Sequence, residues 1–302
     1  MTAAVLQLAG VALAPLLPGT VQSLKARLQG RRGASPLQPY RVLRRLWGKS
    51  VVDPDGSGVI YRLAPAVAAA AMLIAVLLVP VGGRSGSWEL GNDALVLVGL
   101  FALARFAVAA ASWATSNGFS LMGSARDLTL AVFGEGLLVL ALLVAALPAG
   151  STDLVAMSAA ADGSEIWREP AHWCGLLAFA LVVLVETGRQ PIDNPDTHLE
   201  LTMIHEGPLL EYAGRDLAYL HWMAAARHWV VLVLTAELFL PQAGGFAARL
   251  GLLALELVLL CALLALVETA QAKMRILRVP ALLGLGSLIA LVGVASWIAG
   301  AA

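Results

Sequence analysis

Long apolar runs recur along the whole chain and are separated by shorter polar connections. A transmembrane helix needs roughly 20 apolar residues, because each residue advances about 1.5 Å and the hydrocarbon core is about 30 Å thick. The runs are continuous rather than alternating, which favours helices over the strands of a membrane barrel. The pattern predicts about eight transmembrane helices, near residues 2–20, 63–81, 90–114, 130–149, 171–188, 222–241, 247–268 and 279–300.

Composition supports the same fold class. Hydrophobic residues make up 59% of the chain and charged residues only 13%, and a soluble protein of this composition would expose large apolar patches. We therefore expect an all-α polytopic membrane protein in which residues 1–302 form a single integral membrane domain.

The placement of positive residues predicts the topology. The formal net charge is zero, but most Lys and Arg residues lie in the connections after the first, third, fifth and seventh predicted spans. By the positive-inside rule these connections are cytoplasmic and both termini lie outside. The first apolar run lacks a positive region before it and precedes the most basic stretch, so we interpret it as a span and not as a signal peptide.

The first long cytoplasmic connection, residues 21–62, contains an amphipathic segment. Between Leu37 and Trp47, apolar residues alternate with Arg41, Arg44 and Arg45 in a pattern typical of a short helix lying in the membrane interface. The alternative is a solvated basic loop that only fixes the topology.

The second long connection, residues 187–221, is unusually acidic for a cytoplasmic loop. Thr197 and Glu200 match a capping box, which predicts a short helix from Thr197 to about Glu206, ended by Gly207 and Pro208. Helical spacing would give this helix a polar side made of His198, Thr202, His205 and Glu206.

Several charged residues fall within or at the ends of predicted spans. A charge at mid-membrane costs roughly 2.5 to 3.5 kcal/mol, so such residues usually face a bundle interior and often carry protons. The alternative is that each one is neutral or paired and only locks helix packing. The candidates for a proton path in the spans are Arg105, Glu135, Glu186, Glu237, Glu256 and Glu268.

Metal binding and catalysis by this chain alone are not expected. Cys174 and Cys261 lie in predicted spans without Cys-x-x-Cys spacing, which argues against an iron–sulfur cluster or a zinc site. His198 and His205 are seven residues apart, which is about 10.5 Å along a helix and too far for two ligands of one ion. Neither a phosphate-binding glycine loop nor a nucleophile constellation is present.

Four sequence blocks resemble the respiratory complex I subunit 1 family, which includes the NADH dehydrogenase membrane subunit at the quinone site. They read ARLQGRRGASPLQPY, MGSARD, VETGRQPIDNPDTHLELTMIHEGPLLEYAGRDLA and AQAKMRILRVP. Within the family, the third block is similar to the hydrogenase-4 component C and formate hydrogenlyase subunit 4 branch. Asn194 and His198 depart there from the more acidic version of the quinone-reducing complex.

The resemblance implies a membrane-anchor and ion-coupling subunit of a hydrogenase or formate hydrogenlyase complex in a bacterial or archaeal cytoplasmic membrane. It implies hydrogenase large and small subunits as partners, which would carry nickel–iron and iron–sulfur centres, and antiporter-like membrane neighbours. It implies no cofactor in this chain and no nucleic-acid partner. Glu211 joins the proton-path candidates by family position. The residues that would dock the peripheral arm or line a quinone-like chamber are Arg27, Arg31, Arg32, Arg126, Arg189, Asp193, His198, Glu200, His205, Glu206 and Arg215.

Two alternative functions remain open at this point. The first keeps the fold and makes the chain the quinone-site subunit of a complex I-type NADH:quinone oxidoreductase. The second is a stand-alone transporter that uses the intramembrane glutamates for proton symport, although the chain has no convincing internal repeat of the kind many transporters contain.

Overall fold

The computed structural model describes residues 2–301 except 55, 86–90, 194–202 and 243. All secondary-structure elements in these ranges are helical, which confirms the predicted all-α fold. The α-helices are α1 (Thr2–Leu13), α2 (Leu16–Leu28), α3 (Gln38–Trp47), α4 (Val59–Leu78), α5 (Ala94–Ala114), α6 (Gly118–Ala146), α7 (Leu154–Ala160), α8 (Pro170–Glu186), α9 (Gly214–Phe239), α10 (Phe246–Ala270) and α11 (Val279–Ala301). Single 3₁₀ turns are η1 (Ile166–Arg168), η2 (Gly207–Leu209) and η3 (Ile276–Arg278).

Within the described ranges, six of the predicted spans are helices long and apolar enough to cross a membrane, namely α4, α5, α6, α9, α10 and the segment η3–α11. The protein is therefore a multi-pass membrane protein. The predicted count of eight is approximate, because α8 has 17 residues and extends only about 26 Å. Its first residue is Pro170, whose fixed φ suits the first position of a helix.

The first predicted span is broken in two. Helices α1 and α2 meet at an angle of 45°. Pro15 lies at the break, and a proline cannot donate the backbone hydrogen bond that would continue α1. The break is held from two sides: Trp222 Nε1 donates to the carbonyl of Val11 at 3.2 Å, and Tyr40 Oη donates to that of Ala12 at 2.6 Å.

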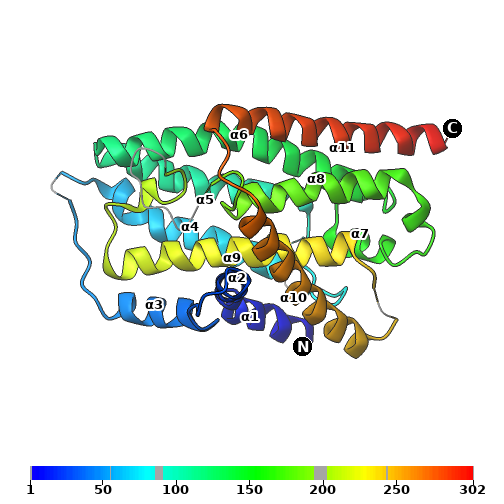
Figure 1. Ribbon diagram of the computed structural model, residues 1–302, viewed down its shortest axis with the longest axis horizontal. Helices are drawn as coiled ribbons and strands as arrows, with labels where there is room; N and C mark the ends of the chain where they lie inside the picture. Colours follow the sequence, from blue (N-terminus) through cyan, green and yellow to red (C-terminus); the bar gives the residue numbers. More distant parts are fainter. Residues whose placement is uncertain (1, 55, 86–90, 194–202, 243, 302) are drawn as a thin grey trace.

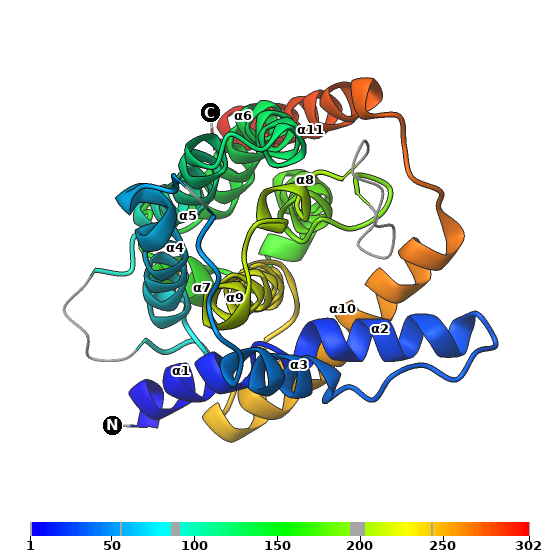
Figure 2. The same ribbon diagram turned by 90° about the vertical axis from the view of Figure 1, so that its left-hand side faces the viewer.

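The long helices lie side by side, and α9 forms the centre of the bundle (Figures 1 and 2). Every residue of α9 from Ala225 to Phe239 is buried, as expected for a helix that is surrounded on all sides. Helix α2 is seen end-on in Figure 1 and lengthwise in Figure 2, so it crosses the long helices. The connection after α8 and helix α3 lie at the end of the bundle where α9 begins.

The predicted amphipathic helix in the first connection is α3. It buries no residue completely, and Arg41, Arg44 and Arg45 are exposed. Trp47 packs edge-on against Tyr219 of α9, with ring centroids 5.2 Å apart. This contact and the hydrogen bond from Tyr40 to Ala12 attach α3 to the bundle. The position of α3 in the membrane interface stays a prediction.

The helix predicted from Thr197 to about Glu206 is wrong over its last turn. Its beginning lies outside the described residues, but residues 204–206 form bends followed by the 3₁₀ turn η2. The backbone N–H of His205 donates to the Asp193 carboxylate at 3.3 Å. A long-range side-chain acceptor therefore replaces the local carbonyl on which a helix depends.

Candidate functional site

Charged side chains from four helices meet inside the bundle. We call them the central cluster, and they are Arg105 of α5, Asp127 and Glu135 of α6, Glu186 of α8 and Arg227 of α9. Arg105 donates from Nη1 to Glu135 Oε1 at 2.6 Å and from Nη2 to Glu186 Oε2 at 3.0 Å, and its Nε lies 3.5 Å from Asp127 Oδ2. Arg227 Nη1 approaches Glu186 Oε2 at 3.2 Å.

Burial makes this pairing energetically necessary. The Arg105 side chain is only 3% exposed and that of Glu186 is fully buried. Removing one partner of such a pair leaves an uncompensated buried charge, which typically costs about 3 to 5 kcal/mol. The central cluster therefore depends on all its members being held in place together.

A second set of ion pairs lies beside the connections, and we call it the loop cluster: Lys25, Arg189, Asp193, Glu268 and Lys273. Glu268 lies 3.2 Å from Lys25 Nζ and 2.9 Å from Arg189 Nη1. Lys273 Nζ lies 2.7 Å from Asp193 Oδ1. The loop cluster thus ties α2 and the connection after α8 to the last turn of α10 and the segment that follows it.

His205 lies between the two clusters. Its Nδ1 is 3.2 Å from Asp193 Oδ2 and its Nε2 is 3.7 Å from Asp127 Oδ1. Burial disfavours the imidazolium, but the hydrogen bond to Asp193 and the charges of both aspartates outweigh it and raise the pKa of His205. Burial also opposes ionisation of Asp193, but His205 and Lys273 hold the pKa of that carboxyl well below its usual range.

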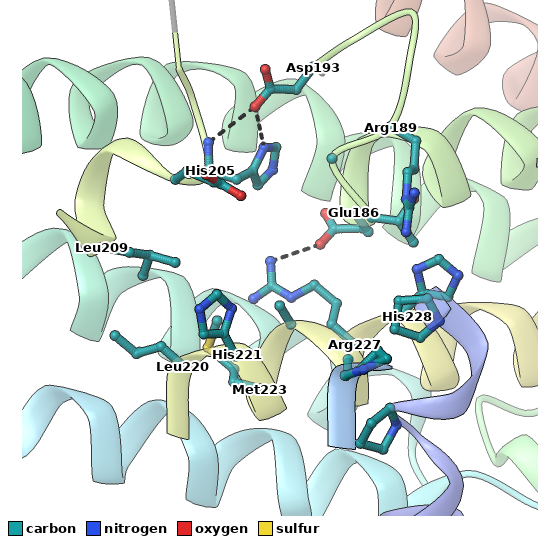
Figure 3. A pocket seen from close by; sticks show the side chains of 18 of the residues that line it. Glu186, Arg189, Asp193, His205, Leu209, Leu220, His221, Met223, Arg227 and His228 are labelled. Atoms are coloured by element: carbon teal, nitrogen blue, oxygen red, sulfur yellow. Dashed lines mark hydrogen bonds and ion pairs between the residues drawn. The ribbon is translucent and has the colours of Figure 1, made fainter. Parts of the chain in front are cut away.

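These groups surround a cavity of about 350 Å³. One wall is apolar and comes from the α1–α2 break and α3, with Pro15, Pro18, Pro39 and Leu43. Figure 3 shows the other walls, where Glu186, Asp193, His205 and Arg227 approach one interior space. A cavity with an apolar side and a charged side can hold water or the polar head of an amphiphile.

Glu237 lies at the opposite end of α9, apart from both clusters. Its carboxylate accepts hydrogen bonds from the backbone N–H groups of Gly82 at 2.6 Å and Gly83 at 3.0 Å, and from Ser158 Oγ at 2.8 Å. Arg249 Nη2 lies 3.9 Å away. Both glycines have positive φ, which turns their two N–H groups toward one anion. This arrangement fits an ionised carboxylate that anchors the turn after α4.

The structure divides the predicted proton-path residues into three groups. Arg105, Glu135 and Glu186 meet in the central cluster, and Glu268 joins the loop cluster. Glu237 and Glu256 lie elsewhere in the bundle, and Glu256 is buried with Oε1 lacking a hydrogen-bond partner among the described residues. Glu211 lies in the connection before α9, where its carboxylate accepts a hydrogen bond from the Asn117 side chain.

The predicted docking or chamber residues also divide. Arg189, Asp193, His205 and Glu206 line the cavity. Arg126 Nη1 donates to the carbonyl of Met203 at 3.4 Å and so holds the connection after α8 against α6. His198 and Glu200 lie outside the described residues. The exposed group consists of Arg27, Arg31, Arg32 and Arg215.

Sequence reasoning did not single out Arg227, Asp127, Lys25 or Lys273 as site residues. Arg227 is an arginine inside the predicted span 222–241, so the same criterion that selected Arg105 would have found it. Asp127, Lys25 and Lys273 lie near polar connections, where a charge is ordinary. Only the fold brings them against buried partners.

Comparisons with known proteins agree with this architecture. The family model described as NADH dehydrogenase matches residues 1–298. Formate hydrogenlyase subunit 4 of Escherichia coli (strain K12) is 34% identical over 281 residues, which cover 88% of this chain and 88% of that protein. Hydrogenase-4 component C of the same organism is 33% identical over 299 residues, covering 95% of this chain and 92% of that protein.

A solved structure shares the fold. A chain in the structure of the membrane-bound sulfane sulfur reductase, an archaeal respiratory membrane complex, superimposes with a TM-score of 0.83 over 98% of both chains at 20% sequence identity. The resemblance expected from the four sequence blocks is thereby confirmed, and the chain belongs to the NADH dehydrogenase family, the family of respiratory complex I subunit 1.

Proposed function

We propose that this chain is the membrane subunit of a hydrogenase or formate hydrogenlyase complex, where it anchors the redox subunits and provides part of a proton path. Formate hydrogenlyase subunit 4 and hydrogenase-4 component C, which are 34% and 33% identical to this chain, are named as components of such systems, and each is matched over most of its length. Electron transfer and hydrogen chemistry would take place in hydrogenase large and small subunits that carry nickel–iron and iron–sulfur centres.

The central cluster is the observation that carries this proposal. Burying several ionised groups inside a membrane bundle is expensive, and such groups usually mark ion pathways. Glu135 is the member with the greatest exposure, since its side chain is 25% exposed. A neighbouring antiporter-like subunit could therefore continue the path from α6, where this chain leaves the carboxylate accessible.

The exposed arginines support the anchoring role. Arg27 lies in the last turn of α2, and Arg31 and Arg32 lie in the connection between α2 and α3; all three are exposed. The positive-inside rule would put this basic segment in the cytoplasm. We propose that it docks the peripheral arm through complementary acidic groups.

Substitution of the glutamates tests the coupling role. Glu135→Gln and Glu186→Gln remove a protonatable group with little change in shape, and Glu165→Gln, in an exposed loop, is the matched control. Hydrogen evolution and membrane potential are measured in vesicles that contain the assembled complex. We expect the two cluster variants to lower the potential generated per hydrogen, whereas an assembled complex with both quantities unchanged would refute coupling by this chain.

The cavity favours a second candidate function, binding of a quinone head group in a quinone oxidoreductase. Its apolar wall near α3 and its charged inner wall suit an amphiphile of that kind. A quinone-site inhibitor should then bind tightly, and Leu43→Trp should block both binding and quinone reduction. Absence of inhibitor binding would leave the hydrogenase function as the only one of the two.

The transporter alternative has less support, because both relatives are named as parts of larger assemblies. Its distinguishing feature is that the chain would work alone.

A further inference from the structure

The position of His205 differs from that of the other histidines that line the cavity. His221 and His228 reach the cavity from α9, but neither has a hydrogen bond or ion pair to a carboxylate among the described residues. His205 instead has a carboxylate on each side of the ring, Asp193 at Nδ1 and Asp127 at Nε2. A histidine in this position can be oriented through one nitrogen while it exchanges a proton through the other.

The Nδ1 side of the ring is fixed. Asp193 Oδ2 accepts both the backbone N–H of His205 at 3.3 Å and, at 3.2 Å, the ring Nδ1, while Lys273 holds Asp193 Oδ1 at 2.7 Å. The ring also packs against Gly188, where an added Cβ would lie 2.9 Å from Nδ1. Asp193 therefore selects the tautomer that carries hydrogen on Nδ1 and leaves Nε2 for exchange.

The Nε2 side faces the central cluster and the cavity. Asp127 Oδ1 lies 3.7 Å from Nε2, a separation that a small ring movement or one bridging water closes. Asp127 in turn contacts Arg105, which joins Glu135 and Glu186. The His205 side chain is 28% exposed and lines the cavity, so water in the cavity can reach it.

The two carboxylates beside His205 can stabilise one additional proton on its ring. Protonated His205 places a single positive charge between Asp127, 3.7 Å from Nε2, and Asp193, 3.2 Å from Nδ1. Opposite charges within this distance favour the charged form of the imidazole.

We infer that His205 is the proton-uptake residue of the central cluster, with Asp193 as its positioning residue and Lys273 holding Asp193 in place. The imidazolium gives its Nε2 proton to the Asp127 carboxylate, and the neutral ring keeps its Nδ1 hydrogen on Asp193. Nε2 then takes up the next proton from water in the cavity. This inference rests on the proposed coupling function and names the residue through which protons reach it.

Spectroscopy on the assembled complex tests the inference without relying on turnover. The chain has five histidines, and ring-labelled histidine can be followed by NMR as the pH changes. We expect one histidine of this chain to titrate above its ordinary pKa of 6.5, to vanish in His205→Gln and to shift downward in Asp193→Asn. The inference would be overturned if His205 stays neutral at pH 6, or if its pKa is the same in the Asp193→Asn variant.

Coupling measurements separate this inference from the proposed function. In vesicles, His205→Gln should lower the charge moved per hydrogen by roughly tenfold or more, because the proton carrier is removed. The control is His172→Gln, because His172 lies in the first turn of α8, at the end of the bundle opposite to His205. If Glu135→Gln uncouples the complex and His205→Gln does not, the role of His205 is wrong while the proposed function stands. If Glu135→Gln also leaves coupling intact, the coupling role in the proposed function is wrong and this inference falls with it.

Discussion

At the scale of single residues, Glu186 of α8 and Glu237 of α9 are held by different kinds of partner. Glu186 is paired with two arginines from other helices, so its neighbours are themselves charged and can change partners. Glu237 accepts hydrogen bonds from two backbone N–H groups and a serine, which are fixed donors. The first environment suits a group in a proton path, and the second suits an anchor.

Glu237→Gln should therefore destabilise the protein, because an amide N–H₂ would face backbone donors and the charge-assisted hydrogen bonds would be lost. We expect a loss of about 2 kcal/mol of unfolding free energy. Glu256→Gln is the comparison. Glu256 already has one oxygen without a partner in the described part of the chain, so this variant should lose less unfolding free energy. Thermal unfolding in detergent gives both values, and equal midpoints for the two variants would contradict the anchoring role.

At the scale of elements, side chains from several parts of the fold hold the described part of the connection after α8 in place. His205 binds Asp193, Arg126 binds the carbonyl of Met203, and Tyr212 stacks on Tyr61 with ring centroids 4.4 Å apart. Glycines permit the close approach of this connection to α6, where a Cβ on Gly123 would lie 2.9 Å from the Cα of Gly207.

This packing predicts that Gly123→Ala displaces the connection. The alanine side chain would collide with the backbone of Gly207. Gly136→Ala in the same helix is the control, because a side chain at that position would meet open space. Gly136→Ala should be neutral or stabilising by up to about 1 kcal/mol, as is usual for glycine in a helix. Limited proteolysis near residue 210 should rise only in Gly123→Ala, and equal cleavage of the two variants would show that the close contact is not needed.

The pH dependence of the connection follows from His205. Because its pKa is raised in the folded protein, the stability that the imidazolium adds is fully present below about pH 6.5 and is lost as the pH rises through the raised pKa. Hydrogen exchange of residues 203–213, corrected for the intrinsic rate at each pH, should therefore show less protection at alkaline pH. His205→Gln should abolish this dependence, and an unchanged profile in that variant would contradict the assignment.

At the scale of the whole molecule, the sequence predicts the membrane bundle well and the site only in part. Apolar runs locate α4, α5, α6, α9, α10 and α11 because a span needs little beyond length and hydropathy. Charged residues inside predicted spans, such as Arg105 and Glu186, can also be predicted as site residues, because a charge interrupts an otherwise apolar run. Asp127, which pairs with Arg105, and Lys25, which pairs with Glu268, could not be predicted, because polar connections carry no periodic signal for which residues meet across the fold. The prediction of a helix ending near Glu206 was wrong over its last turn, because the Asp193 carboxylate, 12 residues away in the sequence, accepts the backbone N–H of His205.

The central claim is that this chain works as the membrane subunit of a hydrogenase-type complex. Its most direct test is the metal content of the tagged chain after extraction of membranes with a mild detergent and affinity purification. We predict that nickel and iron purify with the chain, carried by partner subunits, in fixed proportion to it. A chain that elutes alone, free of nickel and iron, and still moves protons in vesicles would contradict the account and favour the transporter.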